Sequence, residues 1–201
     1  MIKKYVKVNK YYLIFFLLII LLMFFVNKYS LFENIDNSIS DFVIKNVNNA
    51  KVINIFHVIT YLGSARVLII ITLLTLAIEN RDIFDELAIN LSTTYLISYA
   101  LKKIFRRERP SINLIKKPKD FSFPSGHTMC SVSVYGYLIY AVNKYLKNKK
   151  TKVLLTILLS TIMFLVMASR IILNVHYFSD VLFGFILSII LLKMFINYDR
   201  I

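Results

Sequence analysis

The side chains able to do chemistry near neutral pH gather around one short segment, residues 123–127, which reads F-P-S-G-H. Pro124 ends whatever structure precedes it, Ser125 is a favourable helix N-cap, and Gly126 lets another group approach the backbone closely. His127 can take up or release a proton near neutral pH. A helix N-terminus presents free N–H groups and the positive end of a dipole, so the segment predicts an anion site; the alternative is an ordinary capped helix start.

Two further motifs, one upstream and one downstream, add basic, histidine and acidic side chains. They consist of Lys102, Arg109, Pro110, Ser169, Arg170, His176 and Asp180. In order, the three motifs read K-x6-R-P, P-S-G-H and S-R-x5-H-x3-D. This ordered set resembles the signature of the type 2 phosphatidic acid phosphatase family of membrane lipid phosphate phosphatases. That family shares its phosphate site with vanadium haloperoxidases and bacterial acid phosphatases, and every motif position is filled here.

The basic residues of these motifs suit phosphoryl chemistry. Hydrolysis of a phosphomonoester or pyrophosphate needs positive charge for the phosphoryl oxygens, an in-line nucleophile and an acid for the leaving oxygen. Lys102, Arg109 and Arg170 supply the charge, and the forked arginine side chains fit phosphate. The hydroxyl of Ser125 and the backbone N–H groups around Gly126 can hold the remaining oxygens.

His176 and Asp180 are four residues apart at the start of a predicted helix, so they share one face. A carboxylate that accepts the proton of one imidazole nitrogen leaves the other nitrogen free to attack. The family resemblance implies that His176 is the nucleophile that forms a phosphohistidine and that Asp180 orients it. On the same grounds, His127 is the general acid for the leaving group. The alternative for His176 and Asp180 is a buried pair that only holds two helices together.

No metal or other cofactor is expected. The chain lacks clustered carboxylates and a Cys/His set with metal-ligand spacing, and its basic side chains can do a cation's job. The single cysteine, Cys130, excludes an internal disulfide and is expected to pack as a small apolar residue. The formal net charge of +14 implies anionic partners, namely lipid headgroups and phosphates. Nucleic acid is disfavoured because the basic residues sit at the ends of apolar segments.

The composition indicates a membrane protein with a single domain, residues 1–201. Of its residues 58% are hydrophobic and 14% aromatic, with only four glycines and three prolines. The apolar segments predicted to span the membrane are 11–26, 59–78, 86–104, 127–146, 153–168 and 177–196. The polar residues of the segment 86–104 are expected to face the bundle interior. The expected fold is an all-α bundle of six transmembrane helices, with an amphipathic surface helix between the first two.

The surface helix is predicted within residues 31–58, which are too polar to span a membrane. Ile35 and Ile39 recur there at helical spacing, which favours an amphipathic helix on the membrane surface. Asp36, Asn37 and Ser38 are available as caps of this helix. His57 falls outside every motif, and we interpret it as an interfacial or packing residue.

Charge predicts the orientation of the bundle. The basic loop 102–124 and the basic cluster 144–152 lie on opposite faces, because one span separates them. The positive-inside rule places the cluster and the N-terminal lysines together in the cytoplasm, with both chain ends. The loop, with eight lysines and arginines, then faces outward with the active site. The alternative for five of these basic residues is a patch that binds anionic lipids: Arg106, Arg107, Lys116, Lys117 and Lys119.

The function implied by the resemblance is a membrane phosphatase for a lipid phosphate or pyrophosphate. Candidate substrates are undecaprenyl pyrophosphate, phosphatidylglycerol phosphate and phosphatidic acid, and a small single-domain chain favours the polyprenyl pyrophosphate. Transfer of a phosphoryl or headgroup to a lipid acceptor is one alternative, because it can use the same phosphohistidine. A non-enzymatic transporter or scaffold of the same fold is another, although degenerate motifs would be expected there. The oligomeric state is not predicted.

Overall fold

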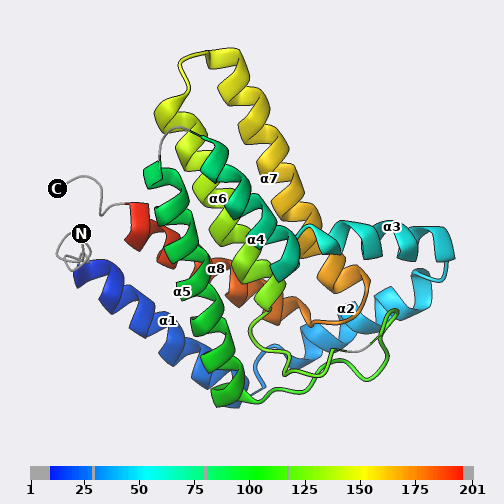
Figure 1. Cartoon of the computed structure of the whole chain (residues 1–201). Helices are drawn as coiled ribbons and strands as arrows, with labels where there is room; N and C mark the ends of the chain where they lie inside the picture. The colour runs from blue at the N-terminus through cyan, green and yellow to red at the C-terminus, as the bar shows by residue number, and fades with distance from the viewer. Residues whose placement is uncertain (1–9, 29, 79–80, 117, 197–201) are drawn as a thin grey trace.

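The computed structural model describes residues 10–28, 30–78, 81–116 and 118–196, and over these residues the chain is all α-helical (Figure 1). Within the described ranges, eight α-helices and one short 3-10 helix follow in this order: α1 Lys10–Lys28, α2 Glu33–Asn46, α3 Ala50–Tyr61, α4 Ala65–Leu74, η2 Thr75–Ala77, α5 Arg81–Phe105, α6 Gly126–Tyr145, α7 Lys149–Ile172 and α8 Phe178–Ile196. Some basic residues used to predict the orientation and the lipid patch lie outside the described residues: Lys3, Lys4, Lys7 and Lys117.

Side-chain caps begin four of the described helices. An oxygen of Asn49, Ser64, Ser125 or Asn148 accepts a backbone N–H at the start of α3, α4, α6 and α7, respectively. Each cap satisfies a donor that the first helical turn leaves unpaired. The predicted cap at Ser125 is confirmed, since its Oγ accepts the backbone N–H of Thr128 at 3.5 Å. Local sequence therefore decides where the helix with the anion-binding segment starts.

Helix α6 runs through the middle of the bundle and packs against α4, α5, α7 and α8 (Figure 1). Its side chains Met129, Val132 and Val134 are completely buried, and their close van der Waals packing against the neighbouring helices stabilises this arrangement. Polar residues of α5 also face α6, as predicted: Asn90 Nδ2 donates to the carbonyl oxygen of Ser133 at 3.1 Å. The predicted anion-binding segment thus heads a helix that neighbours enclose on four sides.

The surface segment differs from its prediction. It forms two helices, α2 and α3, because the chain turns at residues 47–49 and Asn49 starts a new helix. Both run across the end of the bundle where α5 and α7 finish (Figure 1). Asp36 was predicted as a candidate cap, and this is wrong: its side chain lies buried in the first turn of α2. His57 is half-buried on α3, with its ring centroid 5.2 Å from that of Tyr61, in a packing position.

Among the described helices, α1, α7 and α8 are long and apolar enough to cross a membrane, and α3 with α4–η2 makes a fourth candidate span, bent by 46°. The bend contains Gly63, where a Cβ would lie 2.4 Å from Val166 Cγ1 and 2.7 Å from Ser131 Oγ. A glycine therefore lets the elbow touch α6 and α7. The predicted second span, residues 59–78, crosses this elbow. Helices α5 and α6 are less apolar than these candidate spans because polar side chains occupy their inner faces.

The ends of α5 and α7 and the starts of α6 and α8 lie at the same end of the bundle (Figure 1). There the loop between α5 and α6 is tied to the turn between α7 and α8. Asn113 Nδ2 donates to the carbonyl oxygen of Asn174 at 3.0 Å, and Asn174 Nδ2 donates to that of Ile112 at 2.7 Å. Asn174 has a φ of 50°, a left-handed conformation that asparagine tolerates. These connections bring the three motifs together.

Candidate active site

His176 and Asp180 face each other at the start of α8. His176 occupies the turn before the helix and Asp180 its first turn, and their side chains are 2% and 0% exposed. Nδ1 of His176 lies 3.3 Å from Oδ2 of Asp180. The same carboxylate oxygen accepts the backbone N–H of Tyr177 at 2.9 Å and the hydroxyl of Ser122. Asp180 is therefore fixed in place to orient the imidazole.

The other ring nitrogen of His176 points toward a cation. Nε2 lies 3.0 Å from Nη1 of Arg109. Because Asp180 accepts the proton on Nδ1, Nε2 keeps its lone pair, which accepts from the guanidinium. Burial, followed by the positive charges of Arg109 and Lys102, lowers the pKa of His176 well below its ordinary value of 6.5. The ring is therefore neutral at neutral pH, which is the form of histidine that can act as a nucleophile.

Lys102 and Arg109 meet on one carboxylate, that of Asp120 in the loop before α6. Oδ2 lies 3.1 Å from Lys102 Nζ and Oδ1 lies 2.8 Å from Arg109 Nη2. Arg109 also donates to the carbonyl oxygen of Val175 at 2.5 Å. Burial raises the pKa of Asp120, but the positive charges of Lys102 and Arg109 together lower it by more. The pKa of this carboxyl therefore lies below its ordinary value. The side chains of Lys102 and Arg109, which are 8% and 3% exposed, thus share the Asp120 carboxylate, whose side chain is 56% exposed.

The start of α6 presents backbone donors beside these cations. Within the described residues, no hydrogen bond engages the N–H of Gly126 or of His127. The backbone N–H of Ser125 was expected to be among the donors to the phosphoryl oxygens. It is not available to a ligand, because it donates to the carbonyl oxygen of Asp180 at 3.0 Å. A Cβ on Gly126 would lie 3.3 Å from Oγ of Ser98, which is tighter than most Cβ contacts, so the glycine lets the start of α6 pack closely against α5. Two N–H groups remain to hold an anion.

Arg170 lies at the last turn of α7 and is 3% exposed. Its Nη1 donates to the hydroxyl of Thr60 at the end of α3, so the second helix of the surface segment contributes to the site. Its Nε is buried and, among the described residues, has no hydrogen-bond partner. A buried donor without a partner costs about 1–3 kcal/mol, so this nitrogen favours an incoming acceptor such as a phosphoryl oxygen.

His127 lines a cavity of about 200 Å³ together with Lys102 and Asp120. A second cavity, of about 410 Å³, lies between α4 and α5 and is lined mainly by apolar side chains such as Ile69 and Leu96. The two cavities share three lining residues: Ala65, Tyr95 and Cys130. The polar site therefore continues into an apolar groove on the side of the bundle.

Four residues of this site were not assigned to it from the sequence: Asp36, Arg107, Asp120 and Ser122. Ser122 contacts both His176 and Asp180, and Arg107 donates to Oδ1 of Asp180 at 2.9 Å. The lipid-patch interpretation of Arg107 is wrong, because its guanidinium is bonded inside the protein. A sequence signal existed for Asp36, since an acidic residue is unusual on the apolar face of an amphipathic helix.

Comparison with known proteins agrees with the motifs. Residues 86–200, more than half of the chain, match the model of the PAP2 superfamily. The chain is 36% identical over 109 residues to phosphatidylglycerophosphatase B of Bacillus subtilis (strain 168), and this match covers 54% of each protein, so the chain spans about half the length of that relative.

Solved structures extend the similarity to nearly the whole chain. A crystal structure of a transmembrane PAP2 type phosphatidylglycerolphosphate phosphatase from Bacillus subtilis superposes with a TM-score of 0.81 at 26% identity, over 94% of each chain. LpxE of Aquifex aeolicus shares the fold at a TM-score of 0.63 and 21% identity, over 83% of this chain and 96% of its own. The protein is thus an integral membrane protein with several helical spans, and it belongs to the PAP2 superfamily.

Proposed function

We propose that this protein is a membrane phosphatase that releases the terminal phosphate of phosphatidylglycerophosphate through a phosphohistidine on His176. The observation that carries the proposal is the line from the Asp180 carboxylate through the His176 ring to the Arg109 guanidinium. It joins an oriented imidazole to a phosphate-binding cation within hydrogen-bond distance. A structural ion pair would need no guanidinium at the far nitrogen.

In the first step, phosphoryl oxygens replace the Asp120 carboxylate on Lys102 and Arg109, and Arg170 binds another oxygen. Nε2 of His176 attacks phosphorus, a P–N bond forms, and the P–O ester bond breaks. The departing alcohol oxygen takes a proton from His127. The cations and the free N–H groups at the start of α6 stabilise the charge on the equatorial oxygens.

In the second step, water attacks the phosphohistidine. His127, now deprotonated, accepts a proton from this water as the P–N bond breaks. The products are inorganic phosphate and a neutral His176, whose Nδ1–H again donates to Asp180. No cofactor takes part in either step on this proposal.

The apolar groove between α4 and α5 supports a lipid substrate. It begins at the cavity that His127 lines, so a headgroup can reach the site while its chains stay in the groove. The names of the relatives from Bacillus subtilis support phosphatidylglycerophosphate over the polyprenyl pyrophosphate favoured from the sequence.

The proposal includes the topology predicted from charge. Helices α1, α5, α6, α7 and α8, together with the segment 59–78 that runs through the elbow into α4–η2, are taken as six spans, with both chain ends in the cytoplasm and the site outside. Because α6 separates the loop before residue 126 from the basic cluster 144–152, these two segments face opposite sides whichever way the bundle inserts. The positive-inside rule then favours the cytoplasm for the cluster.

The test is phosphate release by purified protein in detergent, with phosphatidylglycerophosphate, phosphatidic acid and undecaprenyl pyrophosphate compared. Among the described residues, no group of three or more His, Cys, Asp or Glu side chains could hold a metal ion, and EDTA in the assay tests metal independence directly. We expect His176→Ala to abolish turnover in protein that still inserts and melts normally. Wild-type phosphate release by that variant would refute the mechanism, and transfer to an added lipid alcohol would favour a transferase.

A further inference from the structure

The two oxygens of the Asp180 carboxylate have different partners. Oδ2 faces His176, whereas Oδ1 accepts a hydrogen bond from Nη1 of Arg107 at 2.9 Å. The Asp180 side chain is fully buried, and among the described residues no other lysine or arginine forms an ion pair with it. The counter-charge in direct contact with this carboxylate therefore comes from Arg107.

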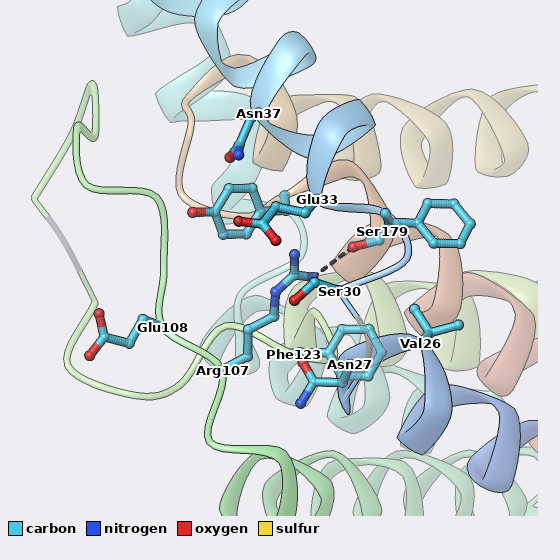
Figure 2. Close-up of a pocket in the computed structure, with 11 residues that line it drawn as sticks. Val26, Asn27, Ser30, Glu33, Asn37, Arg107, Glu108, Phe123 and Ser179 are labelled. Atoms are coloured by element: carbon cyan, nitrogen blue, oxygen red, sulfur yellow. Dashed lines mark hydrogen bonds between the residues drawn. The ribbon is translucent and has the colours of Figure 1, made fainter.

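Arg107 is itself held by α2 and the start of α8. Its Nη2 donates to Oδ2 of Asp36 at 2.6 Å. Its Nη1 donates to Oγ of Ser179 at 2.6 Å, the bond drawn as a dashed line in Figure 2. Its guanidinium carbon lies 4.5 Å from the ring centroid of Tyr177. Asp36 is 1% exposed and also accepts from the backbone N–H and the hydroxyl of Ser179, at 2.9 and 2.6 Å. Arg107 is thus fixed between two buried carboxylates.

We propose that Arg107, anchored by Asp36, is a positioning residue that keeps Asp180 ionised and aligned with Nδ1 of His176. This inference rests on the roles proposed above for His176 and Asp180. An unpaired carboxylate in a buried site is so costly that it takes up a proton instead. A protonated Asp180 holds the Nδ1–H tautomer poorly, and the lone pair on Nε2 is then no longer presented to phosphorus.

The geometry separates this role from phosphate binding. Both terminal nitrogens of Arg107 are engaged by Asp180, Ser179 and Asp36, so neither is directed at the substrate. In the described part of the chain, none of the hydrogen bonds of the Lys102, Arg109 and Arg170 side chains is made with Arg107, so replacing Arg107 removes none of them. We therefore expect replacement to lower kcat and to leave the binding of a phosphate analogue nearly unchanged.

A cavity of about 270 Å³ adjoins Arg107 and is lined by none of the phosphate-binding or catalytic residues. Figure 2 shows the Arg107 guanidinium at its centre, with Glu33 and Asn37 on the α2 side and Asn27 on the α1 side. Arg107→Ala would enlarge this cavity, and a small soluble cation could enter it. Guanidinium ion has the planar donors that the deleted side chain used, so it should restore the contact with Asp180.

The experiment compares Arg107→Ala with Arg106→Gln, its neighbour of equal charge. Arg106 is exposed, and within the described part of the chain its side chain donates only to the carbonyl oxygen of Lys103 at its own helix end. We expect Arg107→Ala to lose kcat by a factor between about a hundred and the roughly 10⁴ that a misoriented imidazole costs in a serine protease triad. KM and the inhibition constant of orthovanadate should change less than threefold. Millimolar guanidinium chloride should recover at least tenfold of kcat in Arg107→Ala, and Arg106→Gln should match the wild type.

Arg107→Lys keeps the charge and guards against a folding defect, because one ammonium group cannot satisfy Asp36 and Asp180 together. We expect its kcat to lie between those of the wild type and Arg107→Ala. Two outcomes overturn the inference. One is a kcat within threefold of wild type for Arg107→Ala. The other is a loss of kcat that guanidinium does not reverse and that comes with an equal loss of vanadate affinity. His176→Ala separates the two proposals: activity in that variant refutes the proposed function, whereas an inactive His176→Ala beside a fully active Arg107→Ala refutes only the role of Arg107.

Discussion

Asp120 forms ion pairs with Lys102 and Arg109, the two cations proposed to bind the substrate phosphate, and this leads to a measurable prediction. Asp120→Asn removes the negative charge and keeps the size of the side chain. The variant should bind inorganic phosphate and orthovanadate more tightly, because these anions no longer compete with an internal carboxylate for Lys102 and Arg109. Product inhibition by phosphate should therefore appear at lower concentrations.

The contacts set the size of this effect. The carboxylate of Asp120 lies 3.1 Å from Lys102 Nζ and 2.8 Å from Arg109 Nη2, and the side chain is 56% exposed. A solvent-exposed ion pair is worth up to about 1 kcal/mol, so two such pairs amount to about 1–2 kcal/mol. That free energy corresponds to a five- to thirtyfold change in an equilibrium constant. We expect the inhibition constants of phosphate and vanadate to fall by this factor.

The assay measures inhibition constants in detergent at fixed ionic strength. Glu108→Gln is the matched control, because Glu108 is an exposed carboxylate of the same loop and points away from the neighbouring Arg107 (Figure 2). It changes the net charge equally without removing a contact to Lys102 or Arg109. An unchanged or weaker inhibition in Asp120→Asn would refute the reasoning and show that Asp120 preorganises the cations for phosphate.

Three further predictions concern mechanism, protonation and topology. His127→Ala should lose about a hundred- to ten-thousand-fold in kcat/KM on a lipid monophosphate and far less on p-nitrophenyl phosphate, whose leaving group needs little protonation; equal losses would make His127 a binding residue. Because the pKa of His176 is lowered below its ordinary value of 6.5, the folded protein keeps this ring neutral at pH 6.5 and above. The neutral ring, and the folding stability linked to it, are lost only as the pH falls below 6.5. An acid limb of kcat/KM at or above pH 6.5 would contradict the assignment of His176 as the nucleophile. In intact cells with Cys130→Ser, a membrane-impermeant maleimide should label Lys116→Cys and not Lys149→Cys; the reverse pattern would place the site in the cytoplasm.

The sequence was sufficient where a local rule or an ordered motif applied. Ser125 caps its helix as expected, and the spacing of His176 and Asp180 alone placed the two side chains on one face. Apolar periodicity located the main helices to within about five residues, apart from the surface segment and the predicted span 59–78, which the elbow at Gly63 interrupts. In the surface segment, a short turn at Asn49 divides one expected helix into two, although the polar run with Asn46, Asn48 and Asn49 is a turn signal that the interpretation as one helix left unused.

Contacts between distant segments could not be predicted in this way. Asp36 and Arg107 are 71 residues apart, and their pairing depends on how α2 lies across the end of the bundle. Arg107 has the same type and local charge as Arg106, so only the fold distinguishes the buried residue from the exposed one. Asp120 carries no motif signal, and its position over two cations follows from the path of the loop before α6.

The hydrogen bond from the Ser125 N–H to the Asp180 carbonyl oxygen joins the start of α6, the proposed anion site, to the start of α8, which follows the proposed nucleophile His176. Both partners are peptide groups, so among side-chain substitutions only proline at position 125 removes one of them. Variants such as Ser125→Ala and Asp180→Asn therefore keep the two helix starts in register while changing the chemistry at each. Lost activity in those variants reports on the reaction itself, and divergent members of such a fold can exchange these side chains without losing the frame that holds them.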